Sequence, residues 1–365
     1  MTGILIDTVG APRQIKDQLK VLSKDIMFTR EGNKGANGYL FFGQNRILNN
    51  EVAVKFYYWG GNVKYHAEPS TLALIEAPNI LPVKSAGLLD GEWAYFVTPR
   101  LDGDLDDVLE KTEHSNLRAV ERIRQVLCGV VHLHQRRYLH RDLKPSNIYV
   151  GDDGRSIIGD FGSIKYIPED LDSIPASSHA VLYRPPESLE AGSYGFAGDL
   201  YQCGVMLYQL LGGYLPYEEM AWLSQKQRRE HDLLPSRADQ ALFVDKCIKE
   251  RIQRGKILDI STLPPWVPDV LKRTIRKATH INPEKRFASA SAFHTHLNNI
   301  KNNIPDWSVI EGRPVLVTPT ISFRILEKDN NLYVQKSKNG GDWRRDNLII
   351  GTSLIDIVCE IEGKI

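Results

Sequence analysis

The sequence has no long apolar run and no basic or apolar leader. Nowhere do its 365 residues reach the roughly 18 to 20 uninterrupted apolar residues that a membrane span requires. The most apolar segment, Val205 to Leu211, is short and ends in Gly212 and Gly213, which predicts a buried helix. Residues 1–7 carry neither a basic region nor an apolar run long enough for a signal peptide. We therefore expect a protein without membrane contact.

The sequence also lacks an excess of charge of one sign and closely spaced cysteines. Lysine and arginine number 46 against 45 aspartate and glutamate, for a formal net charge of +1. This balance gives no support to binding of nucleic acid or of an anionic membrane surface. The cysteines, at positions 128, 203, 247 and 359, are too scattered for a zinc site and too few for a disulfide scaffold. We expect no nucleic acid among the partners and a reducing, cytoplasmic location.

What remains is ordinary for a soluble globular protein, with 42% hydrophobic and 25% charged residues. The length allows one large domain or a few smaller ones. Near the start, Ile15, Leu19 and Leu22 recur at helical spacing, which predicts an amphipathic helix over Gln14 to Leu22. An N-terminal extension, residues 1–24, is therefore expected to pack on the exterior of the domain that follows.

One segment, residues 138–148, has a pattern suited to phosphoryl transfer. Asp142 lies five residues before Asn147, and Asp160 begins a short Asp-Phe-Gly loop soon after. Asp142 can accept the proton of an attacking hydroxyl, while Asn147 and Asp160 offer the hard oxygen ligands that Mg²⁺ prefers beside phosphate oxygens. Lys144 places a cation beside the transferred group. This arrangement resembles the H-R-D-L-x-x-x-N and D-F-G motifs of eukaryotic-type protein kinases.

The resemblance extends to a glycine-rich segment near the N-terminus. Gly35, Gly38 and Leu40 match the pattern G-x-G-x-x-G-x-V, whose backbone amides approach nucleotide phosphates. Asn33 stands at the place of the first glycine, and asparagine tolerates positive φ better than most residues. The resemblance therefore implies that these four positions contact the nucleotide.

The next strand carries the lysine that such kinases use on the α- and β-phosphates. Residues 51–57 are β-branched and aromatic and predict a strand, in which Ala53 and Lys55 match the V-A-I-K motif. The resemblance implies that both contact the nucleotide and that a carboxylate on a following helix holds Lys55. Glu68 is favoured for that role, with Glu76 as the alternative. Pro69, directly after Glu68, suggests that this helix begins near Glu68.

Residues 93–100 predict a further strand that leads into the segment linking the two lobes of such kinases. By resemblance, Thr98 is the gatekeeper residue, and backbone groups of Pro99 to Leu101 line the adenine. Pro99 has no N–H, so hydrogen bonds to adenine must use its carbonyl group and the groups of Leu101.

The second half of the matched region indicates which hydroxyl group is phosphorylated and where the chain itself could be phosphorylated. Lys144 followed by Pro145 is typical of serine/threonine kinases rather than tyrosine kinases. Residues 117–136 predict an amphipathic helix that leads into the catalytic loop, with structural rather than metal-binding histidines. By resemblance, the activation segment runs from Asp160 to Glu187. Its candidate phosphorylation sites are Ser173, Ser177 and Ser178. Ala180 occupies the position where the family usually has a threonine that hydrogen-bonds the catalytic aspartate and lysine.

Two further residues are implied to be structural. Asp199, at the start of a helix expected over residues 200–211, resembles the aspartate that anchors the catalytic-loop backbone, and its position also suggests an N-cap. Arg286 resembles the arginine that forms a buried ion pair with Glu187.

Two segments fall outside the pattern. A charged, helix-prone insertion spans about residues 218–256, and we interpret it as a solvated surface or, alternatively, a docking surface. After residue 300, residues 314–317, 321–326 and 332–335 predict strands, and residues 348–350 and 355–361 are candidates for two more. This β-rich appendix, residues 301–365, is interpreted as a docking module or a cap on the domain.

The sequence thus predicts an α+β protein with a bilobal kinase-like domain over residues 25–300. The expected architecture is a small five-stranded lobe with one helix, a larger helical lobe, and the appendix. The expected reaction moves the γ-phosphoryl group of ATP, with Mg²⁺, to serine or threonine hydroxyls of protein substrates, including the chain itself. The alternatives are a nucleotide-binding pseudokinase scaffold and a kinase of small molecules.

Overall fold

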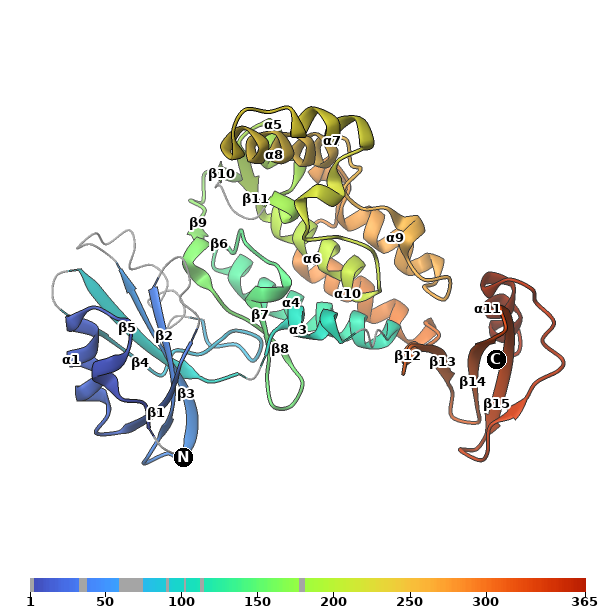
Figure 1. Cartoon of the computed structure of the whole chain (residues 1–365), viewed down its shortest axis with the longest axis horizontal. Helices are drawn as coiled ribbons and strands as arrows, with labels where there is room; N and C mark the ends of the chain where they lie inside the picture. Colours follow the sequence, from blue (N-terminus) through green and yellow to red (C-terminus); the bar gives the residue numbers. More distant parts are fainter. Residues whose placement is uncertain are drawn as a thin grey trace. The chain divides into compact units, whose positions relative to one another are not determined.

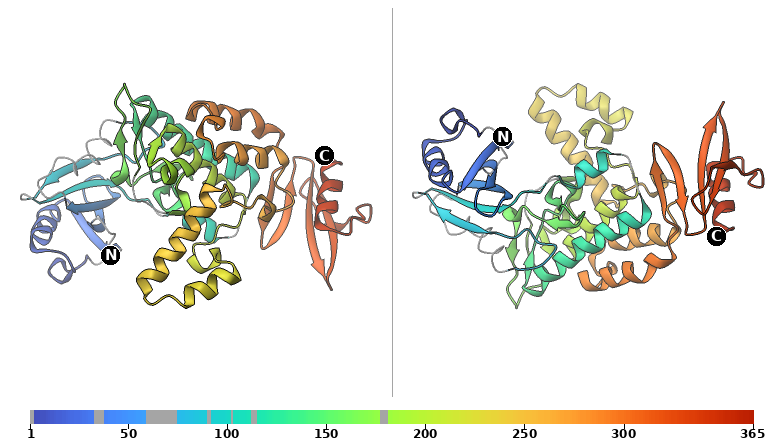
Figure 2. Two further views of the ribbon diagram at one scale, coloured as in Figure 1. Left: turned by 90° about the horizontal axis from the view of Figure 1, so that it is seen from above. Right: turned by 90° about the horizontal axis from the view of Figure 1, so that it is seen from below.

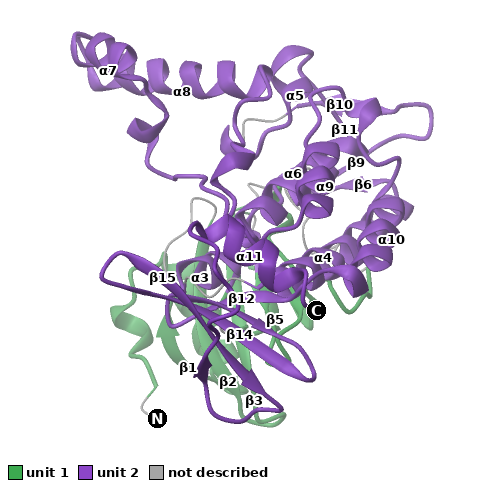
Figure 3. Ribbon diagram, turned by 90° about the vertical axis from the view of Figure 1, so that its right-hand side faces the viewer, with its two compact units in different colours: residues 1–103, 149–164 green, residues 104–148, 165–365 purple. Residues whose placement is uncertain are grey.

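A computed structural model of the chain describes residues 3–32, 38–58, 75–89, 92–101, 103–111, 115–176 and 181–365. The chain forms two compact units, one of residues 1–103 and 149–164 and the other of residues 104–148 and 165–365 (Figure 3). An N-terminal sheet, a helical part and a C-terminal sheet follow one another along the chain (Figure 1). The predicted α+β class is confirmed.

The first unit is built on a five-stranded antiparallel sheet in the order β1-β2-β3-β5-β4. Its strands are β1 (Ile26–Glu31), β2 (Gly38–Asn45), β3 (Asn50–Tyr58), β4 (Ser85–Leu88) and β5 (Trp93–Pro99). The strands predicted for residues 51–57 and 93–100 are confirmed as β3 and β5. Alternate residues of a strand point to opposite faces, so Val54 and Phe56 occupy one face of β3 and Ala53 and Lys55 the other.

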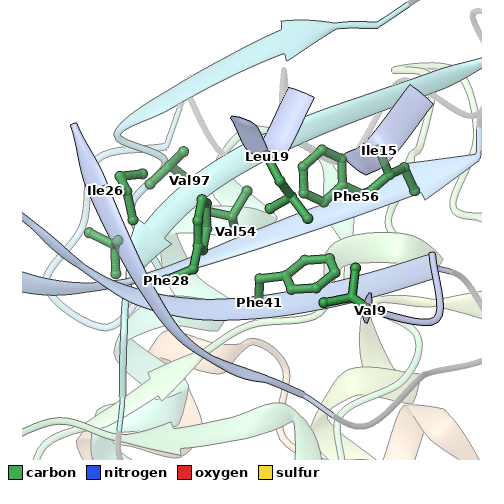
Figure 4. Close-up of a cluster of buried hydrophobic side chains, with 10 residues drawn as sticks. Val9, Ile15, Leu19, Ile26, Phe28, Phe41, Val54, Phe56 and Val97 are labelled. Atoms are coloured by element: carbon green, nitrogen blue, oxygen red, sulfur yellow. The ribbon is translucent and has the colours of Figure 1, made fainter. Parts of the chain in front are cut away.

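The N-terminal helix α1 (Arg13–Leu22), preceded by the 3-10 helix η1 (Ile6–Thr8), covers the first of these faces. Ile15 and Leu19 of α1 are fully buried against Phe41, Val54 and Phe56. Figure 4 shows these side chains gathered between the helix and the sheet. The predicted amphipathic helix is thus confirmed, and its apolar stripe contributes Ile15 and Leu19 to this core.

A short hairpin, which belongs to the first unit except for its first residue, Ile148, completes that unit. It consists of β7 (Ile148–Val150) and β8 (Ser156–Ile158), and the 3-10 helix η4 (Phe161–Ser163) follows it. Asn79 donates a hydrogen bond from its side chain to the carbonyl of Ser156 at 2.9 Å. This contact fixes the hairpin to the segment before β4, and so holds the loop that contains Asp160.

The second unit is mainly helical in its first part. Its longer helices are α3 (Leu105–Glu110), α4 (Asn116–Gln135), α5 (Pro186–Glu190), α6 (Phe196–Leu210), α7 (Gln225–Asp232), α8 (Arg237–Gln253), α9 (Asp269–Ala278) and α10 (Ala290–Ile300). Its 3-10 helices are η3 (Pro145–Asn147), η5 (Val181–Tyr183), η6 (Glu219–Trp222), η7 (Ile260–Thr262), η8 (Pro283–Lys285) and η9 (Lys301–Asn303). Two strand pairs join β6 (Tyr138–Leu139) to β9 (Lys165–Tyr166) and β10 (Ser173–Pro175) to β11 (Ser193–Gly195).

Helix α6 lies at the centre of this part and packs against α4 and α9. It is apolar on most sides and buried along nearly its whole length, as predicted. Its start differs from the prediction, because the helix begins at Phe196 and the N-cap residue is Gly195. Asp199 is therefore inside the first turns and is not the N-cap.

Helices α7 and α8 form the charged segment predicted to be a helical insertion. Both begin with a serine side chain that accepts a hydrogen bond from a backbone N–H in the first turn, Ser224 for α7 and Ser236 for α8. Figure 2 shows the two helices, in yellow, projecting as a pair from the rest of the second unit. Helix α7 has no buried residue, so its surface is available to solvent.

The C-terminal part of the second unit is a five-stranded antiparallel sheet with one helix. Its strands run in sequence order as β12 (Trp307–Ile310), β13 (Arg313–Val317), β14 (Ile321–Lys328), β15 (Asn331–Lys338) and β16 (Arg344–Arg345), followed by α11 (Leu354–Glu362). The three strands predicted here are confirmed, and Asp329 and Asn330 connect β14 to β15 with positive φ, as a tight hairpin turn requires. The strand candidates at residues 348–350 and 355–361 are wrong: the first has no regular structure and the second is α11.

This C-terminal sheet is joined to the helical part by specific contacts. Trp307 is fully buried and packs with Trp266, which precedes α9. The Asp306 carboxylate accepts hydrogen bonds from the Ser115 hydroxyl at 2.8 Å and the Leu117 N–H at 3.1 Å, at the start of α4. These contacts support the interpretation of the appendix as a cap. Among the described helices, none combines the length and the apolarity needed to cross a membrane.

Candidate active site

The strand register of the first unit brings four predicted site residues onto one face of the sheet. Leu40 of β2 pairs with Lys55 of β3, and Ala53 of β3 pairs with Thr98 of β5. Thr98 is buried, whereas Lys55 is partly exposed. Because residues 53 and 55 share a face, the four side chains line the side of the sheet opposite to α1.

Gly38, the remaining described residue of the predicted glycine-rich loop, is required by the backbone itself. Its φ is +153°, and a Cβ atom there would lie 1.9 Å from the carbonyl oxygen of Phe56. Only glycine allows β2 and β3 to approach so closely. Glycine is therefore required at this motif position by the close packing of β2 on β3.

Lys55 and Asp160 form an ion pair within the first unit. Lys55 Nζ lies 3.4 Å from Asp160 Oδ1, although 105 residues separate them. Asp160 has a left-handed backbone, with φ 51° and ψ 73°, a conformation that non-glycine residues adopt mainly where the surroundings hold them in it. The carboxylate remains partly exposed.

Several predicted residues lie outside the described part of the chain. They are Asn33, Gly35, Glu68, Pro69, Ser177, Ser178 and Ala180. The alternative carboxylate, Glu76, is exposed in a segment without regular structure just before the turn at residues 78–79. The described residues therefore do not test which glutamate holds Lys55.

The predicted adenine-binding segment follows β5. Pro99 is the last residue of β5 and pairs with Val52, and the Arg100 N–H donates to the carbonyl of Glu51 at 3.1 Å. An ion pair of 3.1 Å between the side chains of Arg100 and Glu51 supports the same turn. Leu101, immediately after this pairing ends, is half-buried in non-regular backbone.

In the second unit, three predicted residues meet around one carboxylate. Asp142 Oδ2 accepts a hydrogen bond from Lys144 Nζ at 3.0 Å and another from Asn147 Nδ2 at 3.0 Å. Asn147 Nδ2 also donates to the Asp142 carbonyl at 2.7 Å. The other carboxylate oxygen, Asp142 Oδ1, is buried and has no hydrogen-bond partner among the described residues. A buried acceptor without a partner is costly, and it is suited to receive the proton of a bound hydroxyl.

Asp199 of α6 holds the backbone of this loop. Its carboxylate accepts hydrogen bonds from the backbone N–H groups of His140 and Arg141, from the Tyr194 hydroxyl and from His134 Nε2, all between 2.9 and 3.0 Å. Complete burial would raise the pKa of Asp199, but His134 and the backbone donors outweigh it and hold the pKa below its usual value. The residue is thus a buried carboxylate that positions the loop, as the resemblance implied.

Gln202, one turn further along α6, was not predicted from the sequence. Its side-chain oxygen accepts from the Leu143 N–H at 2.9 Å, and its amide nitrogen donates to the carbonyls of Arg141 and Tyr183, both at 3.3 Å. A polar residue in an otherwise apolar buried helix is the signal that could have indicated it. Asp199 and Gln202 together bind the backbone on both sides of Asp142.

Two arginines hold the described part of the activation segment. The Arg137 side chain donates to the carbonyls of Ile167, Pro168 and Leu171 at 2.6–2.8 Å. Arg141 Nη2 donates to the Pro175 carbonyl at 3.1 Å. Ser173, the one candidate phosphorylation site that is described, is exposed in β10.

The end of this segment is fixed by the predicted ion pair. Arg286 Nη1 and Nη2 contact the two carboxylate oxygens of Glu187 at 2.8 and 2.6 Å. The Arg286 side chain is fully buried, lies over the Tyr201 ring and also donates to the Ala197 carbonyl at 2.9 Å. The pair is bidentate, the strongest geometry for these two groups.

Few side chains of the described residues are available as metal ligands. In the described ranges, no three acidic, histidine or cysteine side chains lie together as a metal-binding group. Asn147 uses its amide nitrogen on Asp142, which leaves its oxygen Oδ1 without a hydrogen bond among the described residues. That oxygen and the partly exposed carboxylate of Asp160 are hard ligands, which suits Mg²⁺ delivered with a phosphate.

Known proteins match much of the chain. A family model described as a protein kinase domain matches residues 32–297. The mitosis inducer protein kinase cdr2 of Schizosaccharomyces pombe is 34% identical over 152 residues, which are 40% of this chain and 19% of that protein. The probable serine/threonine-protein kinase PknB of Lactococcus lactis is 24% identical over 235 residues, which are 64% of this chain and 34% of that protein.

A third relative has a different kind of name. The STE20-related kinase adapter protein strd-1 of Caenorhabditis elegans is 27% identical over 222 residues, which are 57% of each chain. The chain therefore spans less than two thirds of the length of each of these three relatives.

Proposed function

The chain belongs to the protein kinase family, and we propose that it is an enzyme that transfers the γ-phosphoryl group of ATP to serine and threonine hydroxyls of proteins. One observation carries the proposal. Asp142 has one carboxylate oxygen held by Lys144 and Asn147 and the other buried without a partner among the described residues. A carboxylate held in this way is suited to receive the proton of a substrate hydroxyl.

In the proposed reaction, Asp142 orients the hydroxyl and accepts its proton. Lys144, 3.0 Å from Asp142, supplies a cation that stabilises the negative charge on the phosphoryl group in transfer. Asp199 and Gln202 keep the loop backbone in place, so that little reorganisation is needed when the substrate binds. Catalysis of this kind depends on positioning and charge rather than on a covalent intermediate.

The first unit is proposed to bind ATP. Lys55 would contact the α- and β-phosphates, with Glu68 as its further carboxylate and with backbone amides of the loop at Asn33, Gly35 and Gly38 on the same phosphates. The adenine would lie on the face formed by Leu40, Ala53 and Thr98, with hydrogen bonds to the backbone of Pro99 and Leu101. The register that places Lys55 and Ala53 on one face supports this arrangement.

Magnesium is proposed to bind with the nucleotide. Asn147 Oδ1 and the Asp160 carboxylate would hold it. When bound, Mg²⁺ neutralises charge on the phosphate oxygens. The Lys55–Asp160 pair would keep the carboxylate in place before the ion arrives.

Specificity for serine and threonine, and the cellular setting, are also proposals. The Lys144-Pro145 sequence and relatives named as serine/threonine kinases support that specificity. We propose a kinase domain over residues 25–300, preceded by the extension 1–24 and followed by the cap 301–365. Autophosphorylation at Ser173, Ser177 or Ser178 and docking of protein partners on residues 218–256 or 301–365 remain predictions. Four free cysteines suit a reducing, cytoplasmic location.

The alternative is a pseudokinase that acts as a nucleotide-binding scaffold. A relative named as a kinase adapter protein, together with Asn33, Pro69 and Ala180 at motif positions, favours this second function. Against it, every residue with a direct chemical role in transfer is present. A kinase of small molecules is a third alternative, and the Lys144-Pro145 sequence argues against it.

The test is incubation with labelled ATP, Mg²⁺ and a mixture of proteins. Mass spectrometry then assigns the phosphate to serine, threonine, tyrosine or a small molecule. Transfer to serine and threonine should be lost in Asp142→Ala and Lys55→Met and kept in Lys24→Met, an exposed lysine of the first unit. Equal background signal in all four proteins, with ATP still bound, would favour the scaffold.

A further inference from the structure

The C-terminal sheet has two faces, and helix α11 packs on one of them. Phe323 and Ile325 of β14 belong to the buried cluster that this helix completes. Because successive residues of a strand point to opposite faces, Arg324 lies on the other face. The strand register places Gln335 of β15 beside Arg324, and Arg345 of β16 beside Gln335. A row of three polar side chains therefore crosses this second face.

The charged side chains that the strands place on this second face are all cationic. They are Arg313, Arg324, Lys328 and Arg345, and we call this surface the basic face. The one acidic residue within the five strands, Glu327, lies on the face of α11. Glu311 precedes β13 and pairs with Arg313 at 3.8 Å, and the other nearby acids, Asp329 and Asp342, lie in the turns at the two ends of β15. The middle of the basic face thus carries positive charge that no carboxylate of the strands balances.

Two of these arginines are held against aromatic rings. Arg324 Cζ lies 4.5 Å from the centre of the Trp343 ring, and Arg345 Cζ lies 5.4 Å from the centre of the Tyr333 ring. Arg324 Nε also donates to Gln335 Oε1 at 2.8 Å. The terminal nitrogens of Arg324 and the whole Arg345 guanidinium have no hydrogen-bond or ion-pair partner among the described residues. Both guanidiniums are therefore positioned in advance and still able to bind an anion.

The geometry suits carboxylates better than nucleic acid. A guanidinium binds a carboxylate through two parallel hydrogen bonds, and one that is already held on a ring loses less freedom when it does so. Nucleotide bases bind mainly by stacking on aromatic rings, but arginines already contact both rings here. Neighbouring strands lie about 4.8 Å apart, so the backbones of Arg324 and Arg345 are about 10 Å apart. An extended chain covers this distance in about three residues, so acidic side chains two or three positions apart can reach both arginines.

We propose that the basic face binds an acidic segment of a protein partner, with aspartate or glutamate carboxylates on Arg324 and Arg345. The proposal does not depend on the proposed catalysis, because the site lies within residues 301–365 and uses no residue of the catalytic loop. It gives the docking role of these residues a chemical class of partner: proteins with closely spaced acidic residues in an extended, exposed segment.

The experiment measures binding of labelled peptides to the full chain by fluorescence anisotropy. One peptide alternates glutamate with serine, and its partner has glutamine in place of every glutamate. At about 50 mM salt, wild type should bind the glutamate peptide about tenfold or more tightly than the glutamine peptide, and added salt should reduce the difference. Arg324→Gln and Arg345→Gln should each weaken binding of the glutamate peptide about threefold to tenfold. Arg324→Lys keeps the charge but not the two parallel hydrogen bonds, and it should resemble Arg324→Gln.

The matched control is Arg344→Gln. Arg344 is exposed and belongs to the same strand as Arg345, but it pairs with Lys336 and lies on the opposite face. This variant removes the same charge and should bind the glutamate peptide within about twofold of wild type. Thermal unfolding of all variants verifies that each is folded. Equal losses in Arg344→Gln and Arg324→Gln would overturn the proposal, because they would show a diffuse attraction to charge. Equal binding of the two peptides by wild type would also overturn it.

A single-stranded RNA with the same number of negative charges as the glutamate peptide tests the other class of partner. The proposal predicts that the RNA binds more weakly than the glutamate peptide under the same conditions. Tighter binding of the RNA, lost in Arg324→Gln and Arg345→Gln and kept in Arg344→Gln, would overturn the acidic protein segment in favour of nucleic acid.

Discussion

The carboxylate of Asp199 accepts a hydrogen bond at 2.9 Å from the backbone N–H of Arg141, a residue 58 positions away. Arg141 has a positive φ of 71°, an uncommon conformation for a long side chain. Asp199 thus stabilises the strained residue directly before Asp142, and it does so from the most deeply buried helix of the second unit. The position of the proposed catalytic aspartate is coupled in this way to the core.

Removal of the Asp199 carboxylate should therefore destabilise the fold. Asp199→Ala leaves four hydrogen-bond donors without their buried acceptor, and we expect a loss of about 3–5 kcal/mol in the free energy of unfolding. Asp199→Asn keeps one acceptor oxygen and should lose less. Urea unfolding measures both, with Asp342→Ala, an exposed aspartate, expected within about 0.5 kcal/mol of wild type. Equal stabilities of Asp199→Ala and Asp342→Ala would contradict the anchoring role.

The ion pair of Arg286 and Glu187 should contribute strongly because it is buried and bidentate. Arg286→Met leaves the Glu187 carboxylate without its partner and should cost about 3–5 kcal/mol of stability. Arg286→Lys should not restore it, since an ammonium cannot form the two parallel hydrogen bonds. The matched control is Glu230→Gln, which removes an exposed pair with Lys226 and should change stability by about 0.5 kcal/mol or less. A similar loss in Arg286→Met and Glu230→Gln would show that the buried pair is not important.

The C-terminal sheet should respond to acid through Asp346. Burial would raise the pKa of Asp346, but the Leu348 N–H and Lys336, whose Nζ lies 3.0 Å away, hold the pKa below its ordinary value of 3.8. Since the folded-state pKa is the lower one, this stabilisation is complete above the unfolded pKa and is lost as the pH falls through the folded pKa. Asp346→Asn should make the unfolding temperature depend less on pH in the acid range, as measured by thermal unfolding. The control Asp342→Asn should keep the pH dependence of wild type. Parallel curves for wild type and both variants would contradict the role of Asp346.

The contact between Asp306 and the start of α4 should hold the C-terminal sheet on the helical part. Asp306→Ala removes the acceptor of the Ser115 hydroxyl and the Leu117 N–H and should cost about 1–2 kcal/mol in urea unfolding. Asp306→Asn keeps an oxygen at the same place and should lose less than half of that amount. If the two substitutions behave alike and neither changes stability, the sheet is held by its apolar contacts alone.

Helices and strands could be predicted where the periodic pattern of apolar residues extends over several turns. Errors arose where that pattern is short. Helix α4 was predicted to within about a residue because its apolar stripe extends over several turns. The segment that forms α11 has apolar residues at neighbouring and alternate positions, which suit a strand as well as a helix. Ser353 and Asp356 form a capping box there, and that local signal identifies the helix. At α6, the Asp199 carboxylate binds distant groups and so does not cap the helix.

The site was predictable as far as its residues lie close together in the chain. Asp142, Lys144 and Asn147 meet because they occupy one short loop, so their spacing alone indicates their contacts. The contact between Tyr217 and Asp106 joins residues 111 positions apart, and no local pattern encodes it. The hydrogen bonds from Arg137 to the activation segment are likewise not encoded by a local pattern. A single arginine in a loop does not indicate which distant carbonyl groups it will contact. Such contacts depend on the tertiary fold, and only the structure reveals them.

The central claim, that Asp142 serves phosphoryl transfer, is tested most directly by the transfer rate of Asp142→Asn. Wild type and variant are saturated with labelled ATP and Mg²⁺ and mixed with a protein substrate, and ATP binding is measured in parallel. The account predicts that wild type phosphorylates serine or threonine, and that the variant binds ATP equally well but transfers about 10²- to 10⁴-fold more slowly. Equal transfer rates in the two proteins, or bound ATP with no transfer by wild type, would contradict it.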